Sequence, residues 1–463
     1  SVKKESVDFL RETQTHPSIA IWAANNENGA DCHANTESET EYRDLYWKSI
    51  LDYVSIYDPT RPKVSSSPSN GNETEAEPCP FNGNTQDPYY GDVHQYLYNQ
   101  DCWNTKIYVR ARFVSEFGWQ SWPSYSTMTQ YLSEDQRYYN SPVMQNRQHH
   151  PNGQQQMINE INLHYGLPNE YYNTTTPNDE GYRYILYATQ YSQAYCYKTE
   201  VEFFRSLRNT CGSNNPGCTM GQMYWQTNDI WPAASWSSVD WLNKYKLVQY
   251  FSQHFYAKIL VIGYNDSQSG NWTFWGINDY TTEYNCIGDN SCTLNLNSYS
   301  YTDGLKNSWN VPVSIDYEDA SKVYSLSQSD MLSQTKCSSL DTDCLLIMNL
   351  IDKNGTTINS NYLLISSPKN TIANDPKLSI SNVIKTSDNM YSIEYNVNAI
   401  SLFVTMETIY NGYFDDNGLL LLPGNHVSTF MTTDNNITAD DLKNSMYLYS
   451  LYEAGGFKNS PQS

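Results

Sequence analysis

The feature that most constrains this chain is a short apolar run, Ile19–Ala24, that shows no polar alternation. A strand of this kind is covered on both faces, as in a parallel sheet with helices on each side. Glu27 follows the run, and a second strand-like stretch, Arg112–Trp119, carries Glu116 in a similar place. In a (β/α)8 barrel the chemistry lies at the carboxyl ends of the strands. Two carboxylates placed there could cleave a glycosidic bond. One would protonate the departing oxygen, and the other would act at the anomeric carbon.

Strand-like and helix-like segments alternate through residues 1–257, where we count five strand–helix units. The predicted strands span 19–24, 62–67, 92–98, 112–117 and 222–226. The clearest helical patterns after the second carboxylate span 181–208 and 241–256. This alternation indicates part of a (β/α)8 barrel with long loops at the carboxyl ends of the strands.

Beyond residue 258 the hydrophobic period changes to two, which is typical of β-sandwiches. Asn354-Gly355 is a strong hairpin signal between two strand-like runs. We expect two immunoglobulin-like sandwiches, at 258–367 and 368–463. The predicted fold class is therefore α/β plus all-β, with a partial barrel at 1–257 followed by the two sandwiches.

The charge balance excludes some classes of partner. Net charge is −22, with 28 Lys and Arg against 50 Asp and Glu, which argues against nucleic acid or an anionic membrane surface. The apolar runs are too short to span a bilayer. Because the chain starts at Ser1 without Met or a signal peptide, we expect a processed piece or a fragment.

Ten cysteines and six Asn-x-Ser/Thr sequons together favour an oxidising secretory or lysosomal route. The cysteines lack the spacing of zinc ligands, so no metal site is predicted. We expect three local disulfides and favour two longer-range ones: Cys211–Cys218, Cys286–Cys292, Cys337–Cys344, Cys102–Cys196 and Cys32–Cys79. The sequons, as candidate N-glycosylation sites, begin at Asn72, Asn173, Asn265, Asn271, Asn354 and Asn436.

Several candidate residues have a structural interpretation beside the functional one. His94, Tyr96 and Tyr98 alternate along a predicted strand, which is common on a sheet face. A Tyr hydroxyl there could instead contact a catalytic carboxylate. Trp225, which ends a predicted strand, is either a core aromatic or a surface on which a sugar stacks. Glu27 and Glu116 could likewise be an unrelated surface pair.

Six short motifs lie in order across residues 16–246: Asn25–Asn28, Ser66–Gly71, Gly91–His94, Ser115–Pro123, Arg147–His150 and Tyr224–Pro232. Together they resemble the lysosomal β-mannosidase family of retaining glycoside hydrolases. The resemblance implies a five-domain enzyme whose barrel contributes strands four to eight here. It makes Glu27 the general acid/base on strand four and Glu116 the nucleophile on strand seven. Asn26 would contact the sugar hydroxyl beside the anomeric carbon, and Trp225 would line the subsite of the cleaved sugar.

We also expect substrate-binding roles for residues in or near these motifs, namely His94, Tyr96, Tyr98, Trp119 and Asp229. The expected activity is a retaining exo-β-mannosidase that removes terminal β-mannose from oligosaccharides and glycoprotein glycans without a cofactor. The alternatives are a sister β-galactosidase or β-glucuronidase, or a catalytically silent glycan-binding subunit. The carboxyl groups of Glu27 and Glu116 should lie about 5–5.5 Å apart, as in retaining enzymes. The missing strands should come from a separate chain of the same precursor or from a segment not included in this one.

Overall fold

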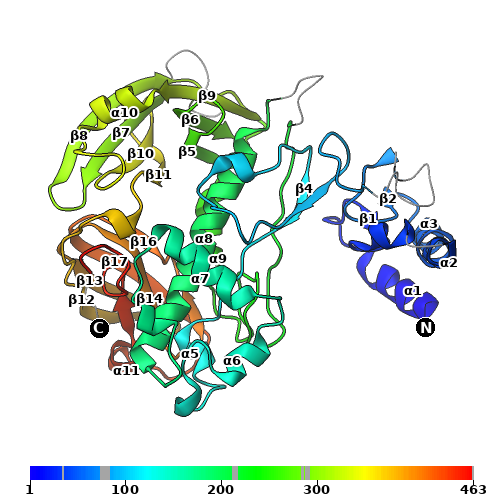
Figure 1. The fold of residues 1–463 in the computed structure, drawn as a ribbon, viewed down its shortest axis with the longest axis horizontal. Coiled ribbons are helices and arrows are strands. Elements are labelled where there is room, and N and C mark those ends of the chain that lie inside the picture. Colours follow the sequence, from blue (N-terminus) through cyan, green and yellow to red (C-terminus); the bar gives the residue numbers. More distant parts are fainter. Residues whose placement is uncertain are drawn as a thin grey trace. The chain divides into compact units, whose positions relative to one another are not determined.

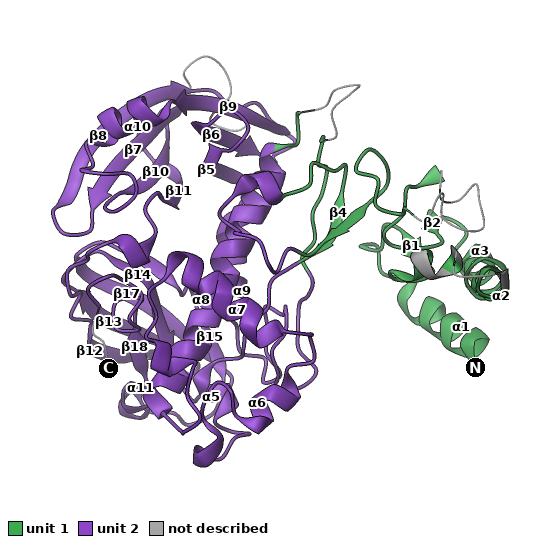
Figure 2. Ribbon diagram, in the orientation of Figure 1, with its two compact units in different colours: residues 1–96, 108–117, 207–224 green, residues 97–107, 118–206, 225–463 purple. Residues whose placement is uncertain are grey.

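A computed structural model describes residues 1–33, 36–72, 74, 84–210, 217–282, 286 and 292–460. The chain forms two compact units, and the first is assembled from three separate segments, 1–96, 108–117 and 207–224. The second unit contains 97–107, 118–206 and 225–463. Figure 2 colours the two units separately. Among the helices of the described ranges, none combines the length and apolar character that a membrane crossing requires.

The first unit carries a series of short strands, with helices before the first strand and between the first two (Figure 1). Its helices begin with α1, Val2–Thr13, which precedes the first strand. The segment after that strand forms the 3-10 turn Asn28–His33, α2 (Thr36–Tyr42), a π-helical stretch Arg43–Leu51 and α3 (Asp52–Tyr57). The strands are β1 (Trp22–Ala23), β2 (Lys63–Val64), β3 (Val93–Gln95) and β4 (Val114–Phe117).

Neighbouring strands of this series pair in chain order. β1 is parallel to β2, and β3 is parallel to β4. Two bridges extend the series: the antiparallel bridge Ser69–Asp92 joins the β2 segment to β3, and the parallel bridge Val114–Gln222 adds the segment after residue 217. The five predicted strands therefore occur in the predicted order, but the last consists of that single bridge and the third ends at Gln95. No pairing in the described ranges joins 19–24 directly to 222–226.

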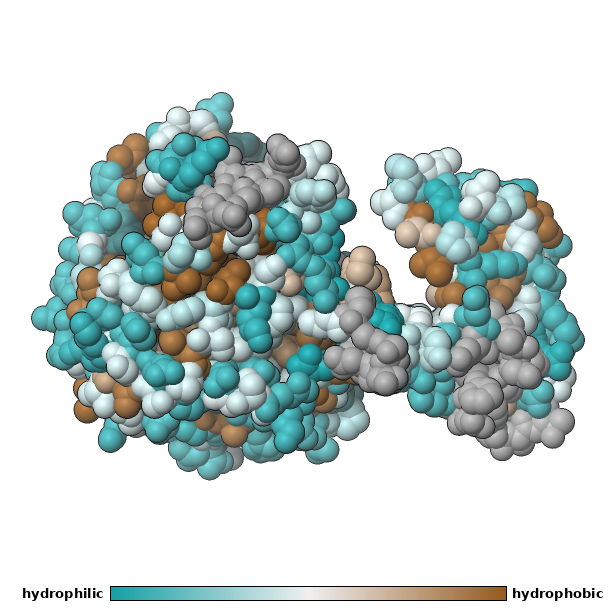
Figure 3. Space-filling model, turned by 90° about the horizontal axis from the view of Figure 1, so that it is seen from above, coloured by the Kyte–Doolittle hydropathy of each residue, from teal (hydrophilic) through white to brown (hydrophobic). Residues whose placement is uncertain are grey.

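Both ends of the strand series leave apolar side chains exposed. Ile21, beside β1, is 52% exposed, and Met223, at the opposite end, is 53% exposed. Figure 3 shows apolar patches on the surface, and the exposed apolar residues of the first unit also include Phe9, Ile56 and Met220. A closed parallel barrel would bury such edges.

The helical part of the second unit surrounds a long buried helix, α8 (Asp179–Ser206), close to its predicted span of 181–208. Most of α8 is buried around its whole circumference, as expected of a helix at the centre of a core. The predicted helix 241–256 is α9, which is shorter, at Leu247–Phe255. The remaining helices are α5 (Tyr125–Met128), α6 (Pro142–Arg147) and α7 (Gly153–His164), with 3-10 turns at Thr105–Ile107, Glu134–Gln136 and Asn169–Tyr171.

The first β-sandwich follows α9 and consists of a three-stranded and a four-stranded antiparallel sheet, ordered β5-β6-β9 and β11-β10-β7-β8. Alternate residues of its strands point into one core that contains Phe274, Leu294, Leu296 and Leu346. The elements are β5 (Ile259–Asp266), β6 (Asn271–Asn278), β7 (Cys292–Ser300), β8 (Gly304–Val313), β9 (Asp319–Leu326), α10 (Gln328–Thr335), β10 (Leu345–Asp352) and β11 (Thr357–Leu364).

The second sandwich also has two antiparallel sheets, β12-β13-β17-β15 and β16-β14-β18. It begins after a 3-10 turn at Pro368–Asn370. The elements are β12 (Ser379–Ser387), β13 (Met390–Val397), β14 (Ser401–Glu407), β15 (Gly412–Phe414), β16 (Leu419–Leu421), β17 (Gly424–Thr432), α11 (Ala439–Ser445) and β18 (Tyr447–Tyr449).

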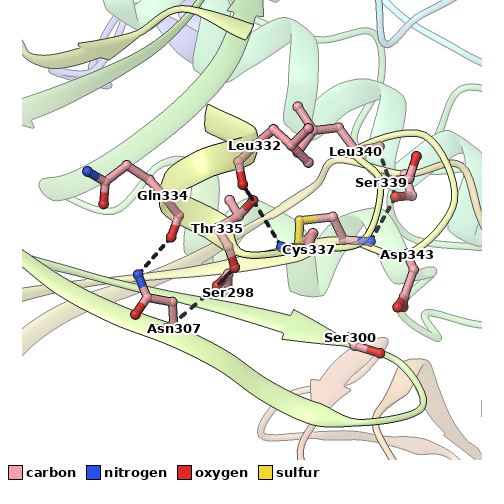
Figure 4. Close-up of a disulfide and its surroundings, with 12 residues drawn as sticks. Ser298, Ser300, Asn307, Leu332, Gln334, Thr335, Cys337, Ser339, Leu340 and Asp343 are labelled. Atoms are coloured by element: carbon pink, nitrogen blue, oxygen red, sulfur yellow. Dashed lines mark hydrogen bonds between the residues drawn. A yellow bond between two sulfur atoms is a disulfide. The ribbon is translucent and has the colours of Figure 1, made fainter. Parts of the chain in front are cut away.

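Three of the predicted disulfides are present: Cys102–Cys196, Cys286–Cys292 and Cys337–Cys344. Cys32 and Cys218 are also disulfide-bonded, while their predicted partners, Cys79 and Cys211, lie outside the described residues. Figure 4 shows the hydrogen bonds around the Cys337–Cys344 disulfide of the first sandwich. Ser298 of β7 donates to the carbonyl of Thr335 at 2.6 Å, and Asn307 of β8 donates to that of Gln334 at 2.7 Å. Disulfides of this kind are typical of an oxidising compartment.

Candidate active site

The turn after β1 holds Glu27 in a defined position. The Asn25 side chain donates to the carbonyl of Ser65 at 2.6 Å and accepts the backbone N–H of Asn28 at 3.2 Å. The backbone N–H of Glu27 donates to the carbonyl of Ser67 at 2.8 Å, which ties the turn to the β2 segment. Glu27 adopts a φ of +61°, an uncommon conformation for a residue other than glycine that surrounding contacts must maintain. Its side chain is 52% exposed and therefore reachable from solvent.

Glu116 lies on β4 and is more enclosed, with a side chain that is 13% exposed. The hydroxyl of Tyr96 donates to its Oε1 at 2.6 Å. A hydrogen bond from a neutral donor to a carboxylate is strong and directional. Tyr96 therefore fixes the orientation of the Glu116 carboxylate. The functional interpretation of Tyr96, as a hydroxyl that contacts one of the two glutamates, is the one that the geometry favours.

The buried imidazole of His94 lies between the two carboxylates. Its Nδ1 is 2.7 Å from Glu27 Oε1 and 3.6 Å from Glu116 Oε2, and the ring is only 2% exposed. One oxygen of each glutamate and the ring nitrogen all lie within 4.8 Å of one another. Carboxyl groups about 5–5.5 Å apart are typical of retaining glycosidases, whereas inverting ones need about 6.5–9.5 Å for an intervening water. This limit applies to one oxygen of each glutamate, so it places both carboxyl groups at one site, while the retaining separation stays a prediction.

A second set of polar groups supports His94 from behind. Ser67 Oγ lies 3.0 Å from Nε2 of the ring and donates to Asp92 Oδ2 at 2.7 Å. Asp92 Oδ1 accepts the backbone N–H of Ser69 at 2.8 Å, and Ser115 Oγ also donates to Asp92 Oδ2. Our sequence reasoning did not assign Ser67 or Asp92 to the site. The available signal was their place in the motifs Ser66–Gly71 and Gly91–His94, at the ends of two neighbouring strands.

The cluster of Glu27, His94 and Glu116 offers one imidazole nitrogen and two carboxylate oxygens, which is a possible ligand set for a divalent cation. The 2.7 Å contact between His94 and Glu27 engages the same nitrogen in a hydrogen bond. The ring nitrogen that a cation would need is therefore already engaged, and paired carboxylates cleave glycosides by acid–base and nucleophilic chemistry alone.

The other predicted substrate-binding residues have the following positions within their own units. Asn26 is exposed and lies beside Glu27 in the first unit, where its backbone bridges to Ser67. Tyr98 belongs to the second unit, where its hydroxyl accepts from Trp236 Nε1 at 2.9 Å and its ring packs against His150. Trp225 is exposed on the second unit, and its carbonyl accepts from the Tyr197 hydroxyl.

Trp119 and Asp229 are buried in the second unit. The indole N–H of Trp119 donates to Glu200 Oε2 at 3.0 Å. Burial raises the pKa of Glu200 to about 8, and the bond from Trp119 opposes that rise only in part. The charge of Asp229 favours protonation of the buried amine of Lys246, whose pKa burial lowers to about 8. The Trp119–Glu200 bond thus fixes the loop after residue 118, and the backbone N–H of Asp229 donates to the carbonyl of Val239 at 3.0 Å.

Comparison with known proteins gives consistent matches. Residues 373–454 match a model of the Ig-fold domain found in mannosidases. The chain is 33% identical to a β-mannosidase of Mus musculus over 435 residues, which covers 91% of this chain and 47% of the relative. It is 27% identical to β-mannosidase A of Aspergillus flavus, covering 92% of this chain and 49% of that protein. The chain therefore spans about half the length of the curated relatives that it matches.

Two solved structures share the fold. A β-D-mannosidase from Dictyoglomus thermophilum superposes with a TM-score of 0.70 at 20% identity, covering 97% of this chain and 50% of that one. An exo-chitosanase from Amycolatopsis orientalis superposes with a TM-score of 0.62 at 14% identity, covering 97% and 53%. At these identities the likeness concerns the fold alone.

Proposed function

Because this chain belongs to the β-mannosidase family of glycoside hydrolases, with homology over 91% of its length, we propose that it carries the catalytic carboxylates of a retaining exo-β-mannosidase. The substrate is a terminal non-reducing β-D-mannose on an oligosaccharide or a glycoprotein glycan. Glu116 is the nucleophile and Glu27 is the general acid/base.

The observation that carries this proposal is the cluster in which one oxygen of Glu27, one of Glu116 and Nδ1 of His94 lie within 4.8 Å of one another. In the first step Glu116 attacks the anomeric carbon while Glu27 gives a proton to the departing oxygen. In the second step Glu27 takes a proton from water, and that water releases mannose from the covalent intermediate. Tyr96 steadies the attacking carboxylate through its 2.6 Å hydrogen bond.

The difference in exposure of the two glutamates fits these roles. Glu27 is 52% exposed, as required of a group that meets both the leaving group and the incoming water. Glu116 is more enclosed and held by a hydrogen bond, as required of a group that must attack in one direction. The sugar-binding roles of Asn26, Tyr98, Trp119, Trp225 and Asp229 belong to the same proposal and rest on the family motifs.

We further propose that the strand series of the first unit forms strands four to eight of a (β/α)8 barrel. Three more strands, from outside the given chain, would complete it. The exposed apolar side chains at both ends of the series, and the match to about half of each relative, support this. The corresponding domain boundaries are 1–257 for the partial barrel, then 258–367 and 368–463 for the sandwiches.

A lysosomal or secreted location is part of the proposal, supported by the disulfides. N-glycosylation is a further part of it, because most of the sequon asparagines are exposed. The exposed ones are Asn72, Asn173, Asn265, Asn354 and Asn436, while Asn271 is half-buried.

Azide rescue in the complete enzyme tests the two roles. With Glu27→Ala and an activated aryl β-mannoside, azide should enter after the covalent intermediate forms and give β-mannosyl azide. With Glu116→Ala, azide should attack directly and give α-mannosyl azide. Glu12→Ala, which removes an exposed carboxylate from α1 of the same unit, should behave as wild type.

A panel of nitrophenyl glycosides distinguishes the sugar. Hydrolysis of the β-mannoside well above the β-galactoside and β-glucuronide supports the proposed substrate. Preferred hydrolysis of another sugar would replace it with a sister activity. In the azide experiment, β-mannosyl azide from Glu116→Ala or α-mannosyl azide from Glu27→Ala would show that the two roles are wrongly assigned.

A further inference from the structure

The hydrogen bonds around His94 determine which of its ring nitrogens carries a proton. The ring has a polar partner on each side, Glu27 at Nδ1 and Ser67 at Nε2. A serine hydroxyl has one hydrogen and two lone pairs, so Ser67 can donate to only one partner at a time. Its oxygen lies 2.7 Å from Asp92 and 3.0 Å from the ring.

The hydroxyl hydrogen of Ser67 belongs to Asp92. A carboxylate accepts but cannot donate, so two oxygens 2.7 Å apart repel unless the Ser67 hydrogen lies between them. Ser115 Oγ and the backbone N–H of Ser69 also donate to Asp92, which shows a carboxylate surrounded by donors, as expected of its ionised form. The lone pair of Ser67 is therefore left to face the ring, and Nε2 must supply the hydrogen for that contact.

We propose that Asp92 and Ser67 act as positioning residues that hold the His94 proton on Nε2, so that Nδ1 and Glu27 share a single proton between them. This rests on the proposed role of Glu27 as acid/base. With Nε2 protonated, a neutral ring offers only a lone pair at Nδ1, and the 2.7 Å contact to Glu27 then requires a protonated carboxyl. If the proton moves to Nδ1, the result is an imidazolium beside an ionised Glu27. Both states contain one proton in that contact.

The shared proton suits both steps of the double displacement. Glu27 gives this proton to the departing oxygen, which leaves its carboxylate facing the Nδ1 lone pair. The contact then holds no hydrogen until Glu27 removes a proton from water in the second step. The water proton then restores the starting state, so the cycle neither gains nor loses a proton at His94.

The charged groups that face His94 within this unit are consistent with that cycle. Glu27 and Glu116 face Nδ1, and Asp92 lies behind Ser67 with its Oδ2 at 4.0 Å from Nε2. When Glu116 becomes part of the covalent intermediate, its negative charge at 3.6 Å from Nδ1 disappears. The second step then proceeds with one negative charge fewer beside Nδ1.

Nitrogen NMR of the chain with ¹⁵N-labelled histidine tests the proton position without any need for activity. The chain has eight histidines, and the His94 signals are identified by their loss in His94→Gln. We expect Nε2 to appear protonated throughout the titration from acid to neutral pH. A neutral His94 with a bare Nε2 and a protonated Nδ1 would overturn the proposal.

Variants of Ser67 then test the cause. In Ser67→Ala the ring loses its acceptor at Nε2, so the neutral Nδ1–H form becomes populated. Its Nδ1–H then donates to an ionised Glu27, which has no proton of its own to give. Ser69→Ala is the matched control, because its backbone N–H still donates to Asp92 and its side chain does not touch the ring. Ser67→Thr keeps the hydroxyl and should restore the Nε2–H signal. An unchanged Nε2–H signal in Ser67→Ala would show that the Asp92–Ser67 pair does not determine which ring nitrogen carries the proton.

A kinetic readout in the complete enzyme separates this positioning role from the chemistry itself. We expect Ser67→Ala to lower kcat/KM on an alkyl β-mannoside by roughly 10–100-fold, because that leaving group needs a proton. With a dinitrophenyl leaving group, which needs none, the loss should be under about threefold. Equal losses on both substrates would contradict the proton-sharing role. An inactive enzyme with the expected NMR signals would refute the proposed function but not the proton position.

Discussion

The β-strands of the first unit differ in length and burial from those of the first sandwich in the second unit. β1 and β2 are two residues long and end in turns that carry polar side chains such as Glu27. The strands of the first sandwich are eight to ten residues long and alternate between a buried and an outer face. The short strands leave apolar residues such as Ile21 and Met223 exposed, while the sandwich buries Leu294 and Leu346 completely. The first region thus carries the candidate active site, and the second has a hydrophobic core of its own.

Loss of one carboxylate should have very different effects in the two regions, and this is the largest effect we predict. Glu116→Gln keeps the shape of the side chain but removes the nucleophile, so kcat/KM should fall by at least about 10⁴-fold. Glu394→Gln, on β13 of the second sandwich, should leave activity within twofold, roughly, since surface substitutions have small effects. Steady-state kinetics on an aryl β-mannoside measures both. Comparable losses in the two variants would erase the functional distinction between the regions.

Truncation of the sandwich core should instead affect stability. Leu346→Ala removes a fully buried side chain and should lower the local unfolding free energy of β7 and β10 by about 2–5 kcal/mol. Hydrogen exchange of the intact chain, read by mass spectrometry, measures this strand by strand. Ile384→Ala, at an exposed position of β12, serves as the control. If Leu346→Ala reduced protection only in the first unit, the stability of the sandwich core would not be independent of that unit.

Removal of a local disulfide should have a smaller effect on the same sandwich. Replacing Cys337 and Cys344 by Ser opens a bridge between residues seven apart, which should cost about 2–3 kcal/mol. Hydrogen exchange should rise around α10 and the start of β10, with little change in β13 of the second sandwich. If protection in β13 fell equally, the two sandwiches would unfold as one cooperative element.

The buried Glu200 gives the smallest expected effect, a dependence of stability on pH in the second unit. Burial raises its pKa to about 8 from the ordinary value of 4.5. Between those values the folded chain keeps a proton that the unfolded chain has lost, so its contribution to stability is full at acid pH and falls as pH rises to about 8. Between those pH values urea unfolding should show a slope from this group of about 1.4 kcal/mol per pH unit.

Glu200→Gln should remove this part of the slope, because the amide cannot ionise. Glu134→Gln, at an exposed position, should leave it intact. If unfolding free energy depended more steeply on pH in Glu200→Gln than in wild type, burial of Glu200 would not be the cause of the pH dependence.

Periodicity predicted the sandwiches closely, because a half-buried strand records its environment in every second residue. The hairpin expected around Asn354-Gly355 occurs between β10 and β11. The strand expected at 222–226 failed for the opposite reason. Only Gln222 forms a bridge there, and Met223 is exposed. A run of apolar residues does not by itself record whether a partner strand pairs with it.

The site was predictable to a similar degree. Glu27 and Glu116 stood at the ends of predicted strands and His94 and Tyr96 along another, and the structure brings all four together. Ser67 and Asp92 were not predictable as supports for His94, because they are 25 residues apart and meet only when the β2 segment lies beside β3. Contacts of this kind depend on strand pairing, which the composition of neither strand encodes.

The most direct test of the account is to trap the intermediate on Glu116. A β-mannosyl fluoride with fluorine in place of the hydroxyl beside the anomeric carbon slows both steps, and its good leaving group lets the covalent intermediate accumulate. Mass spectrometry of the digested complete enzyme should then find the fluoromannosyl group on the peptide that contains Glu116, with one label per active site. A label on Glu27 or on another carboxylate, or turnover by an enzyme that never becomes labelled, would contradict double displacement at Glu116.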